Sequence, residues 1–221
     1  MKTWQEILPI KKEVFVRFGV EFARYTDAAF SVEVALAARI GNGARIGDGA
    51  SIGDRARIGD GARIGDGAII GDGASIGYEA SIGDRARIGY GASIGNGASI
   101  GYGASIGDRA SIGDGARIGD RASIGYEARI GDGARIGDGA SIGYGARIGK
   151  DDAYMTLGPI GSRNAMMTVV CHKGTLTIHT GCFHGGEEEF FAAVVKTHGT
   201  NIHATNYRAA IEFARAALWM A

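Results

Sequence analysis

The chain has 221 residues, of which 39 are Gly, two are Pro and two are Cys, and its formal net charge is zero. Glycine makes up roughly 18 % of the residues, against an average near 7 %. Collagen is excluded because it needs abundant Pro and Gly at every third position. General disorder is also excluded, because hydrophobic residues make up 45 % of the chain.

The sequence also bears on disulfide content, membrane insertion, cellular location and nucleic-acid binding. Two cysteines, Cys171 and Cys182, are too few for a disulfide framework, although one bridge remains possible. No apolar run approaches the ~20 residues of a membrane span, and the first residues lack the apolar stretch of a signal peptide. We therefore expect a cytoplasmic protein without a membrane segment. Zero net charge also argues against general nucleic-acid binding.

Residues 1–37 precede a regular repeat and are predicted to form an N-terminal cap. Counting back in sixes from Ile40 finds only apolar residues, namely Val34, Ala28, Phe22 and Val16. A degenerate coil in the same register is therefore predicted, because the end of a solenoid must cover apolar surface and unpaired backbone groups.

An unbroken six-residue repeat occupies residues 38–150. Ile-Gly recurs from Ile40-Gly41 to Ile148-Gly149, and Ala stands two positions before each Ile. The unit is Ile-Gly-(Asp/Asn/Tyr)-(Gly/Arg/Glu)-Ala-(Arg/Ser), with Lys150 closing the last register and Ile69 at one Arg/Ser position. This Gly content excludes a stable helix and favours short strands that meet at tight corners, where Gly, Asn and Asp tolerate positive φ.

Repeats of six residues are typical of parallel β-helices. The unit resembles that of the hexapeptide-repeat left-handed β-helix family, in which three hexads make one triangular coil. The fold predicted is therefore mainly β, a prism of about six coils with three internal Ile columns. An N-terminal cap and a small C-terminal α+β module would complete it.

The period ends at Lys150, and residues 151–221 are predicted to be that α+β module. The segment 157–164 is predicted to be a loop, and the runs 167–171 and 175–179 flank Lys173-Gly174 as a β-hairpin. Glu187–His198 is predicted to be a helix, because acids fill its first turn and Gly199 follows it. A second helix is predicted from about Thr205 to Met220.

Three segments of the module resemble a C-terminal module of uncharacterised bacterial and phage proteins. They are Gly158-Pro159-Ile160-Gly161-Ser162-Arg163, Thr180-Gly181-Cys182-Phe183 and Thr197-His198-Gly199. The resemblance implies no established activity, but it makes a phage-encoded protein a hypothesis. The loop carrying Ser162 and Arg163 could hold an anion or simply join the prism to the hairpin.

Resemblance to the hexapeptide family implies acyl transfer from acetyl-CoA or acyl carrier protein, with a His as general base, and a homo-oligomer that is often a trimer. Residues 38–150 contain no His and no Cys, which departs from that pattern.

All five His lie in the C-terminal module, and the weak catalytic candidates there are His184, His198 and Cys182. Cys182 and His198 could form a thiol–imidazole pair. No metal site is predicted, since Cys182-Phe183-His184 is at most half a zinc site and the Asp columns lack the calcium-binding repeat pattern.

The prism surface offers a second kind of site. Tyr90, Tyr126 and Tyr144 share one corner column, and Arg87 lies on the face that leads to that corner. Tyr and Arg are enriched at interfaces, so these residues are candidates for partner or ligand binding. The alternative is that the corners are simply solvated and their ion pairs contribute little.

Two functions follow from these observations. The first is a non-catalytic binding or scaffold protein without a cofactor, which sequesters a host protein or a nucleotide-like molecule. Tyr would stack on a base and Arg would pair with phosphate. The alternative is an acyltransferase that uses acetyl-CoA and takes its His from the C-terminal module.

Overall fold

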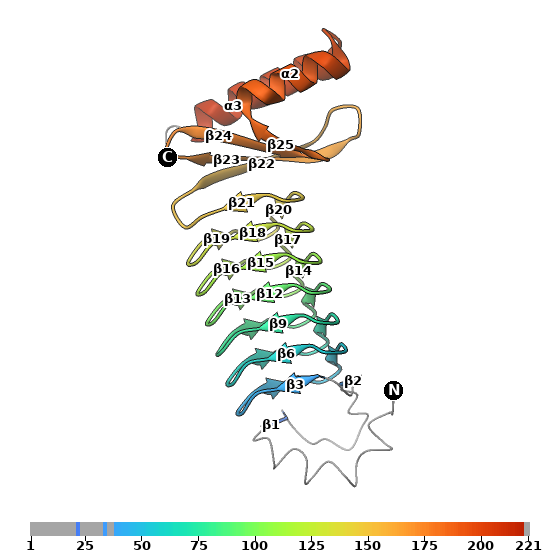
Figure 1. Cartoon of the computed structure of the whole chain (residues 1–221), viewed down its shortest axis with the longest axis vertical. Helices are drawn as coiled ribbons and strands as arrows, with labels where there is room; N and C mark the ends of the chain where they lie inside the picture. Colours follow the sequence, from blue (N-terminus) through green and yellow to red (C-terminus); the bar gives the residue numbers. More distant parts are fainter. Residues whose placement is uncertain (1–20, 23–32, 35–37, 219–221) are drawn as a thin grey trace.

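A computed structural model describes residues 21–22, 33–34 and 38–218, and it shows a three-sided column of stacked coils that carries a sheet and two helices at one end (Figure 1). The three sides are seven-stranded parallel sheets of two-residue strands. The first sheet contains β1 (Glu21–Phe22), β4 (Arg45–Ile46), β7 (Arg63–Ile64), β10 (Ser81–Ile82), β13 (Ser99–Ile100), β16 (Arg117–Ile118) and β19 (Arg135–Ile136).

The other two sheets have the same construction. The second contains β2 (Glu33–Val34), β5 (Ser51–Ile52), β8 (Ile69–Ile70), β11 (Arg87–Ile88), β14 (Ser105–Ile106), β17 (Ser123–Ile124) and β20 (Ser141–Ile142). The third contains β3 (Arg39–Ile40), β6 (Arg57–Ile58), β9 (Ser75–Ile76), β12 (Ser93–Ile94), β15 (Ser111–Ile112), β18 (Arg129–Ile130) and β21 (Arg147–Ile148). The predicted β-helix is thereby confirmed.

The interior consists of the Ile and Ala of each hexad. Residues 18 apart pair with one another, so Ile94 lies between Ile76 and Ile112. From Ile46 onward these Ile side chains are nearly fully buried, as is almost every Ala that precedes them. Each buried Ile contributes about 2 kcal/mol of transfer free energy. Within the repeat, the strand residue before each of these Ile points outward, and there the chain places Arg or Ser, except at the exposed Ile69.

The corners contain two kinds of Gly that serve different purposes. The Gly after each Ile packs directly on the next coil, and a Cβ on Gly95 would lie 2.5 Å from the backbone nitrogen of Asp114. The residue two positions later is the one in the left-handed region, and it is Gly, Arg or Glu, as at Gly97 (φ 63°) and Arg85 (φ 58°). The expectation that Asn or Asp takes the positive φ is therefore wrong.

The corner Asp and Asn have another use, because they accept a backbone hydrogen bond from the coil before. The Asn96 amide donates to Oδ1 of Asp114 over 2.7 Å, and the Tyr78 amide donates to Oδ1 of Asn96 over 2.8 Å. This bond needs the Asp or Asn backbone to stay out of the left-handed region and its side chain to turn back along the column. The corner carboxylates are thus engaged in holding adjacent coils together.

The N-terminal register differs from the one predicted. Phe22 pairs with Ile46, which is 24 residues later, whereas Val34 pairs with Ile52 at the usual 18. Simple counting in sixes places Ala28 beside Ile46. An extra hexad therefore separates the two N-terminal strands, and the rest of the predicted cap within residues 1–37 lies outside the described residues.

The C-terminal module is a four-stranded antiparallel sheet covered by two helices. Its strands β22 (Ala153–Ile160), β23 (Ala165–His172), β24 (Thr175–Thr180) and β25 (Phe183–Gly186) follow one another in order. The helices are α2 (Glu187–His198) and α3 (Ile202–Leu218). The predicted hairpin is present. The loop predicted at 157–164 is confirmed only for the turn at 161–164, because β22 continues to Ile160 through a register shift that accommodates Gly158-Pro159.

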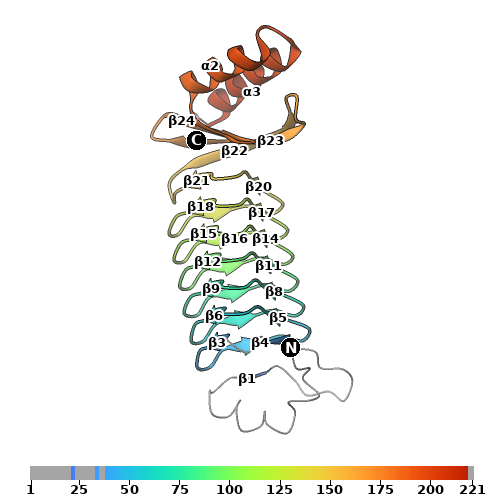
Figure 2. The ribbon, with the colours of Figure 1, turned by 45° about the vertical axis from the view of Figure 1, so that its right-hand side comes forward.

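The sheet lies across the end of the prism, with the helices on its other face (Figure 2). Alternation along the strands divides their side chains between the two sides. Tyr154 and Val170 pack against the prism core, whereas Met167 and Ile178 pack against the helices. The module therefore caps the apolar end of the solenoid and has a small core of its own.

The C-terminal module also provides hydrogen-bond acceptors for the last coil. The three corner Gly N–H groups of that coil have no further coil to which they could donate. Each finds a side-chain oxygen beyond the repeat. The bonds run from Gly137 to the Tyr154 hydroxyl (3.1 Å), from Gly143 to the Thr168 hydroxyl (3.0 Å) and from Gly149 to the Asp152 carboxylate (2.7 Å). No helix among the described residues is long and apolar enough to cross a membrane.

The two Gly classes predict different costs for the same substitution two residues apart. Gly95→Ala places a Cβ against the backbone of the next coil and should lower the free energy of unfolding by roughly 2–3 kcal/mol. Gly97→Ala meets nothing within 4 Å and should cost only the roughly 1 kcal/mol of a left-handed L-residue. Urea unfolding followed by circular dichroism measures both, and equal costs would contradict this account of the corners.

The capping bonds predict a local change in amide protection. The double variant Tyr154→Phe, Thr168→Val removes the two hydroxyl acceptors while keeping the side-chain volumes similar, at a cost of about 1 kcal/mol per bond. Hydrogen exchange should accelerate at the amides of Gly137 and Gly143. The amide of Gly149, bonded to Asp152, is the internal control. Acceleration at all three amides alike would show that the whole cap had loosened instead.

Candidate functional site

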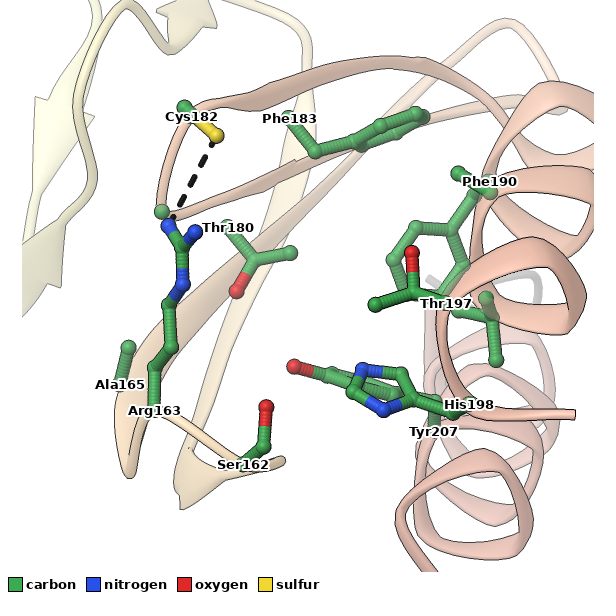
Figure 3. Close-up of a pocket in the computed structure, with 13 residues that line it drawn as sticks. Ser162, Arg163, Ala165, Thr180, Cys182, Phe183, Phe190, Thr197, His198 and Tyr207 are labelled. Atoms are coloured by element: carbon green, nitrogen blue, oxygen red, sulfur yellow. Dashed lines mark hydrogen bonds between the residues drawn. The ribbon is translucent and has the colours of Figure 1, made fainter. Parts of the chain in front are cut away.

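A pocket of about 160 Å³ opens in the C-terminal module between the sheet and helix α2 (Figure 3). Its lining comes from residues 162–165 and 180–183, from the part of α2 at 190–198, and from Tyr207 of α3. The first two segments are the turns that join β22 to β23 and β24 to β25. The pocket is therefore built from two strand turns and one helix C-terminus.

Ser162 and Arg163 belong to the turn between β22 and β23. Gly161 begins this turn with φ of 73°, in the left-handed region that favours glycine. The Tyr207 hydroxyl occupies the space where a Cβ on Gly161 would lie, so helix α3 packs directly on the turn. This close approach holds Ser162 and Arg163 at the mouth of the pocket.

Cys182 belongs to the opposite turn, between β24 and β25, which Gly181 enters with φ of 54°. An Arg163 guanidinium N–H donates to the Cys182 sulfur over 3.7 Å. A Cβ on Gly181 would lie 3.4 Å from that guanidinium. The two turns are thus joined by an Arg–thiol contact, which Figure 3 shows as a dashed line.

His198 is the last residue of α2, and its half-buried ring faces the pocket beside Tyr207 (Figure 3). The two ring centroids are 5.9 Å apart, and the His203 ring lies 5.6 Å from His198 on the other helix. Thr197 lines the pocket next to it. An imidazole at this place can accept or deliver a proton at the pocket.

The remaining wall is apolar. Phe183 meets Phe190 edge to face at 5.2 Å, and Phe190 meets Tyr207 in the same manner at 5.4 Å. Val194 continues this surface along α2. The pocket thus has one polar side, with Ser162 and Arg163, and one aromatic side.

The structure brings together four of the residues predicted from the sequence, namely Ser162, Arg163, Cys182 and His198. The three segments that resemble the bacterial and phage module all contribute to the pocket lining. Tyr207, Phe183 and Phe190 complete the site, although the sequence singles out none of them as functional. Their only signal is an apolar position on a helix or strand, which is the signal of any core residue.

His184 does not join the pocket. Its Nδ1 lies 3.1 Å from Nδ1 of His179, and the two rings stack at 4.5 Å. His179 is buried in the sheet at 1 % exposure, and its Nε2 has no hydrogen-bond partner. Burial, together with His184 and Arg147, lowers the pKa of His179 to about 4. Among the described residues, no group of three or more His, Cys, Asp or Glu side chains is placed to hold a metal ion.

The predicted Tyr corner lies on the prism, outside the pocket. Tyr126 and Tyr144 stack with parallel rings at 5.6 Å, and both are exposed. Arg109, rather than the predicted Arg87, contacts this pair, donating to the Tyr126 hydroxyl over 2.8 Å. The neighbouring Glu127 raises the pKa of Tyr126.

Tyr90 lies two coils from Tyr126 in the same column, and Asp108 separates them. The corner is therefore one stacked pair and one single ring, not a continuous aromatic ladder. Tyr102 on another corner repeats the Arg contact, because Arg85 donates to its hydroxyl over 2.7 Å.

Comparison with protein families gives a match in the repeat region. The family described as bacterial transferase hexapeptide (six repeats) matches residues 37–68, 61–96 and 115–150. These matches cover most of the repeat region, and they support the resemblance of its coils to the hexapeptide-repeat left-handed β-helix. No curated protein matches the sequence.

Solved structures with this fold include two acyltransferases that resemble the hexapeptide-repeat chain. LpxA, a UDP-N-acetylglucosamine acyltransferase from Bacteroides fragilis, is 23 % identical with a TM-score of 0.51, over 56 % of this chain and 53 % of that one. The acetyltransferase domain of PglB from Neisseria gonorrhoeae is 20 % identical with a TM-score of 0.45, over 61 % and 62 %. The chain therefore spans less than two thirds of the length of either, and the likeness to LpxA shows the fold alone.

The buried His179 predicts a pH dependence of stability in this hexapeptide-repeat protein. Its folded pKa of about 4 lies below the unfolded value near 6.5, so the unfolded chain binds the proton first as pH falls. This group should therefore destabilise the fold progressively from about pH 6.5 to pH 4, by roughly 3 kcal/mol in total. Urea unfolding at pH 7, 5.5 and 4 measures the free energy of unfolding at each pH. That free energy should fall less steeply with decreasing pH for His179→Leu than for the natural chain. An unchanged pH dependence would contradict the assignment.

Proposed function

We propose that the protein is an acyltransferase that uses acetyl-CoA and reacts in the pocket of its C-terminal module, with His198 as the general base. The observation that carries the proposal is the placement of the His198 imidazole beside hydroxyl groups in a pocket, on a solenoid of the bacterial transferase hexapeptide type. Because residues 38–150 contain no His, a histidine base must come from outside the coils.

The roles follow from the chemistry of the lining residues. His198 accepts the proton of an acceptor hydroxyl or amine as that group attacks the thioester carbonyl. The new carbon–oxygen or carbon–nitrogen bond forms, the carbon–sulfur bond breaks, and the imidazolium returns the proton to the CoA thiolate. Ser162 and Tyr207 provide hydroxyl donors for the carbonyl oxygen, whose negative charge grows in the transition state.

The size of the pocket limits what can enter it. A ligand site that buries a whole drug-sized molecule holds roughly 300–1,000 Å³, and this one holds about 160 Å³. A small acceptor fits these dimensions, and the thioester end of CoA would reach it from the open side of the pocket. The nucleotide part of CoA would lie outside, on the surface of the module or on a neighbouring subunit. The homotrimer that the family resemblance implies is part of the same proposal.

A second function is supported by the Tyr corner. Exposed, parallel rings at Tyr126 and Tyr144, with Arg109 beside them, are suited to stacking on a base or an aromatic side chain of a partner. In this version the protein is a non-catalytic binding protein, for a host protein or a nucleotide-like molecule, and the pocket is a second contact.

One experiment separates the two functions. Titration with acetyl-CoA, followed by measurement of free thiol release with a panel of small amines and alcohols, should show binding and turnover. His198→Gln should lower kcat at least a hundredfold while CoA binding changes little, because general-base catalysis contributes 10²–10⁴-fold.

His203→Gln is the matched control, because His203 lies next to His198 without lining the pocket. It should retain most of the activity. Absence of acetyl-CoA binding at millimolar concentration would overturn the acyltransferase proposal and leave the binding protein as the better account.

A further inference from the structure

The geometry of the pocket points to a small carboxylic acid as its ligand. Arg163 would hold the carboxylate, and a compact apolar group would lie against Phe183, Phe190 and Val194. Only the identification of this acid as the acyl acceptor rests on the proposed function, because binding of the acid can be measured without CoA.

The charge of the pocket is one-sided. Arg163 is its only permanently charged side chain, and neither Asp nor Glu lines it. Within the part of the chain that the structure describes, the only hydrogen bond of Arg163 goes to the Cys182 sulfur, and no carboxylate lies within ion-pair distance of it. A thiol is a weak acceptor, so the guanidinium retains donors for a stronger one.

The guanidinium is a planar fork whose N–H groups match the two oxygens of a carboxylate. The contacts described above place this fork at the pocket. The exposed Arg163 follows Gly161, on which the Tyr207 hydroxyl packs, and its guanidinium lies across Gly181 of the facing turn. The charged group therefore already lies at the pocket before a ligand arrives.

The other half of the pocket selects the rest of the ligand. Phe183, Phe190 and Val194 line it with two aromatic rings and a branched side chain, which favour an apolar group. An engineered apolar cavity of roughly 150 Å³ is large enough to bind benzene. At about 160 Å³, this pocket accommodates one six-membered ring or a short branched chain beside the carboxylate.

The same arrangement defines the substrate class under the proposed function. A ligand anchored by its carboxylate at Arg163 would direct a hydroxyl or amino substituent toward His198, which lines the same pocket. The acceptor is then a small hydroxy acid or amino acid with an apolar substituent. Its nucleophile loses a proton to His198, and its carboxylate stays bound throughout.

The test compares a charged probe with its neutral counterpart. Benzoate and benzamide have nearly the same shape, and titration of each into the full-length protein is followed by amide NMR shifts of residues 162–163 and 181–183. Benzoate should bind at least tenfold more tightly than benzamide. Arg163→Gln should remove this preference, and Arg163→Lys should keep only part of it. Arg208→Gln is the control, because Arg208 lies over the Phe191 ring and outside the pocket lining.

Three results would overturn the inference: no benzoate binding, equal binding of benzoate and benzamide, or an unchanged preference in Arg163→Gln. Tighter binding of phenyl phosphate than of benzoate would assign the site to phosphate and would also overturn it. Failure of the proposed function is distinguishable, because it would leave benzoate binding intact while the acetyl-CoA assay shows no turnover.

Discussion

The structure depends on the contact between successive coils at the Gly that follows each Ile. The Gly95 amide donates to the Ile112 carbonyl over 2.8 Å, and this leaves no room for a Cβ between the two backbones. Every hexad contributes one such corner, so each coil is held at the distance that a parallel sheet requires. A side chain at this position would separate neighbouring coils.

This constraint explains where chemistry can occur in the molecule. The uninterrupted coils offer only outward Arg and Ser and the corner side chains, so a concave site has to form beyond the repeat. The end of the repeat also needs a cover for its Ile columns and its three corner amides. One sheet meets both needs, because Thr168 and His179 face the prism while Met167 and Ile178 support the helices that enclose the pocket.

Periodicity predicted the features that depend on local spacing. The Ile columns follow from the period of six, and α2 follows from the acids at its start and Gly199 at its end. The strand β22 could not be predicted, because Gly158-Pro159 has the composition of a turn and only pairing with β23 makes it a strand. The pocket was beyond prediction for the same reason. Its three segments are visible in the sequence, but their convergence around Tyr207 is a result of tertiary packing.

The Tyr corner and the pocket make different demands on the fold. Where Tyr replaces Asp or Asn, as at Tyr126 and Tyr144, the corner loses the carboxylate that accepts an amide hydrogen bond from the coil before. Such a bond contributes about 1 kcal/mol, and the ring stack with its Arg109 contact offsets part of that loss at the surface. The pocket depends on the prism only as the support of the sheet that carries it. Changes at the Tyr corner should therefore alter prism contacts and leave the reaction proposed at His198 the same, so the two sites are separable by mutation.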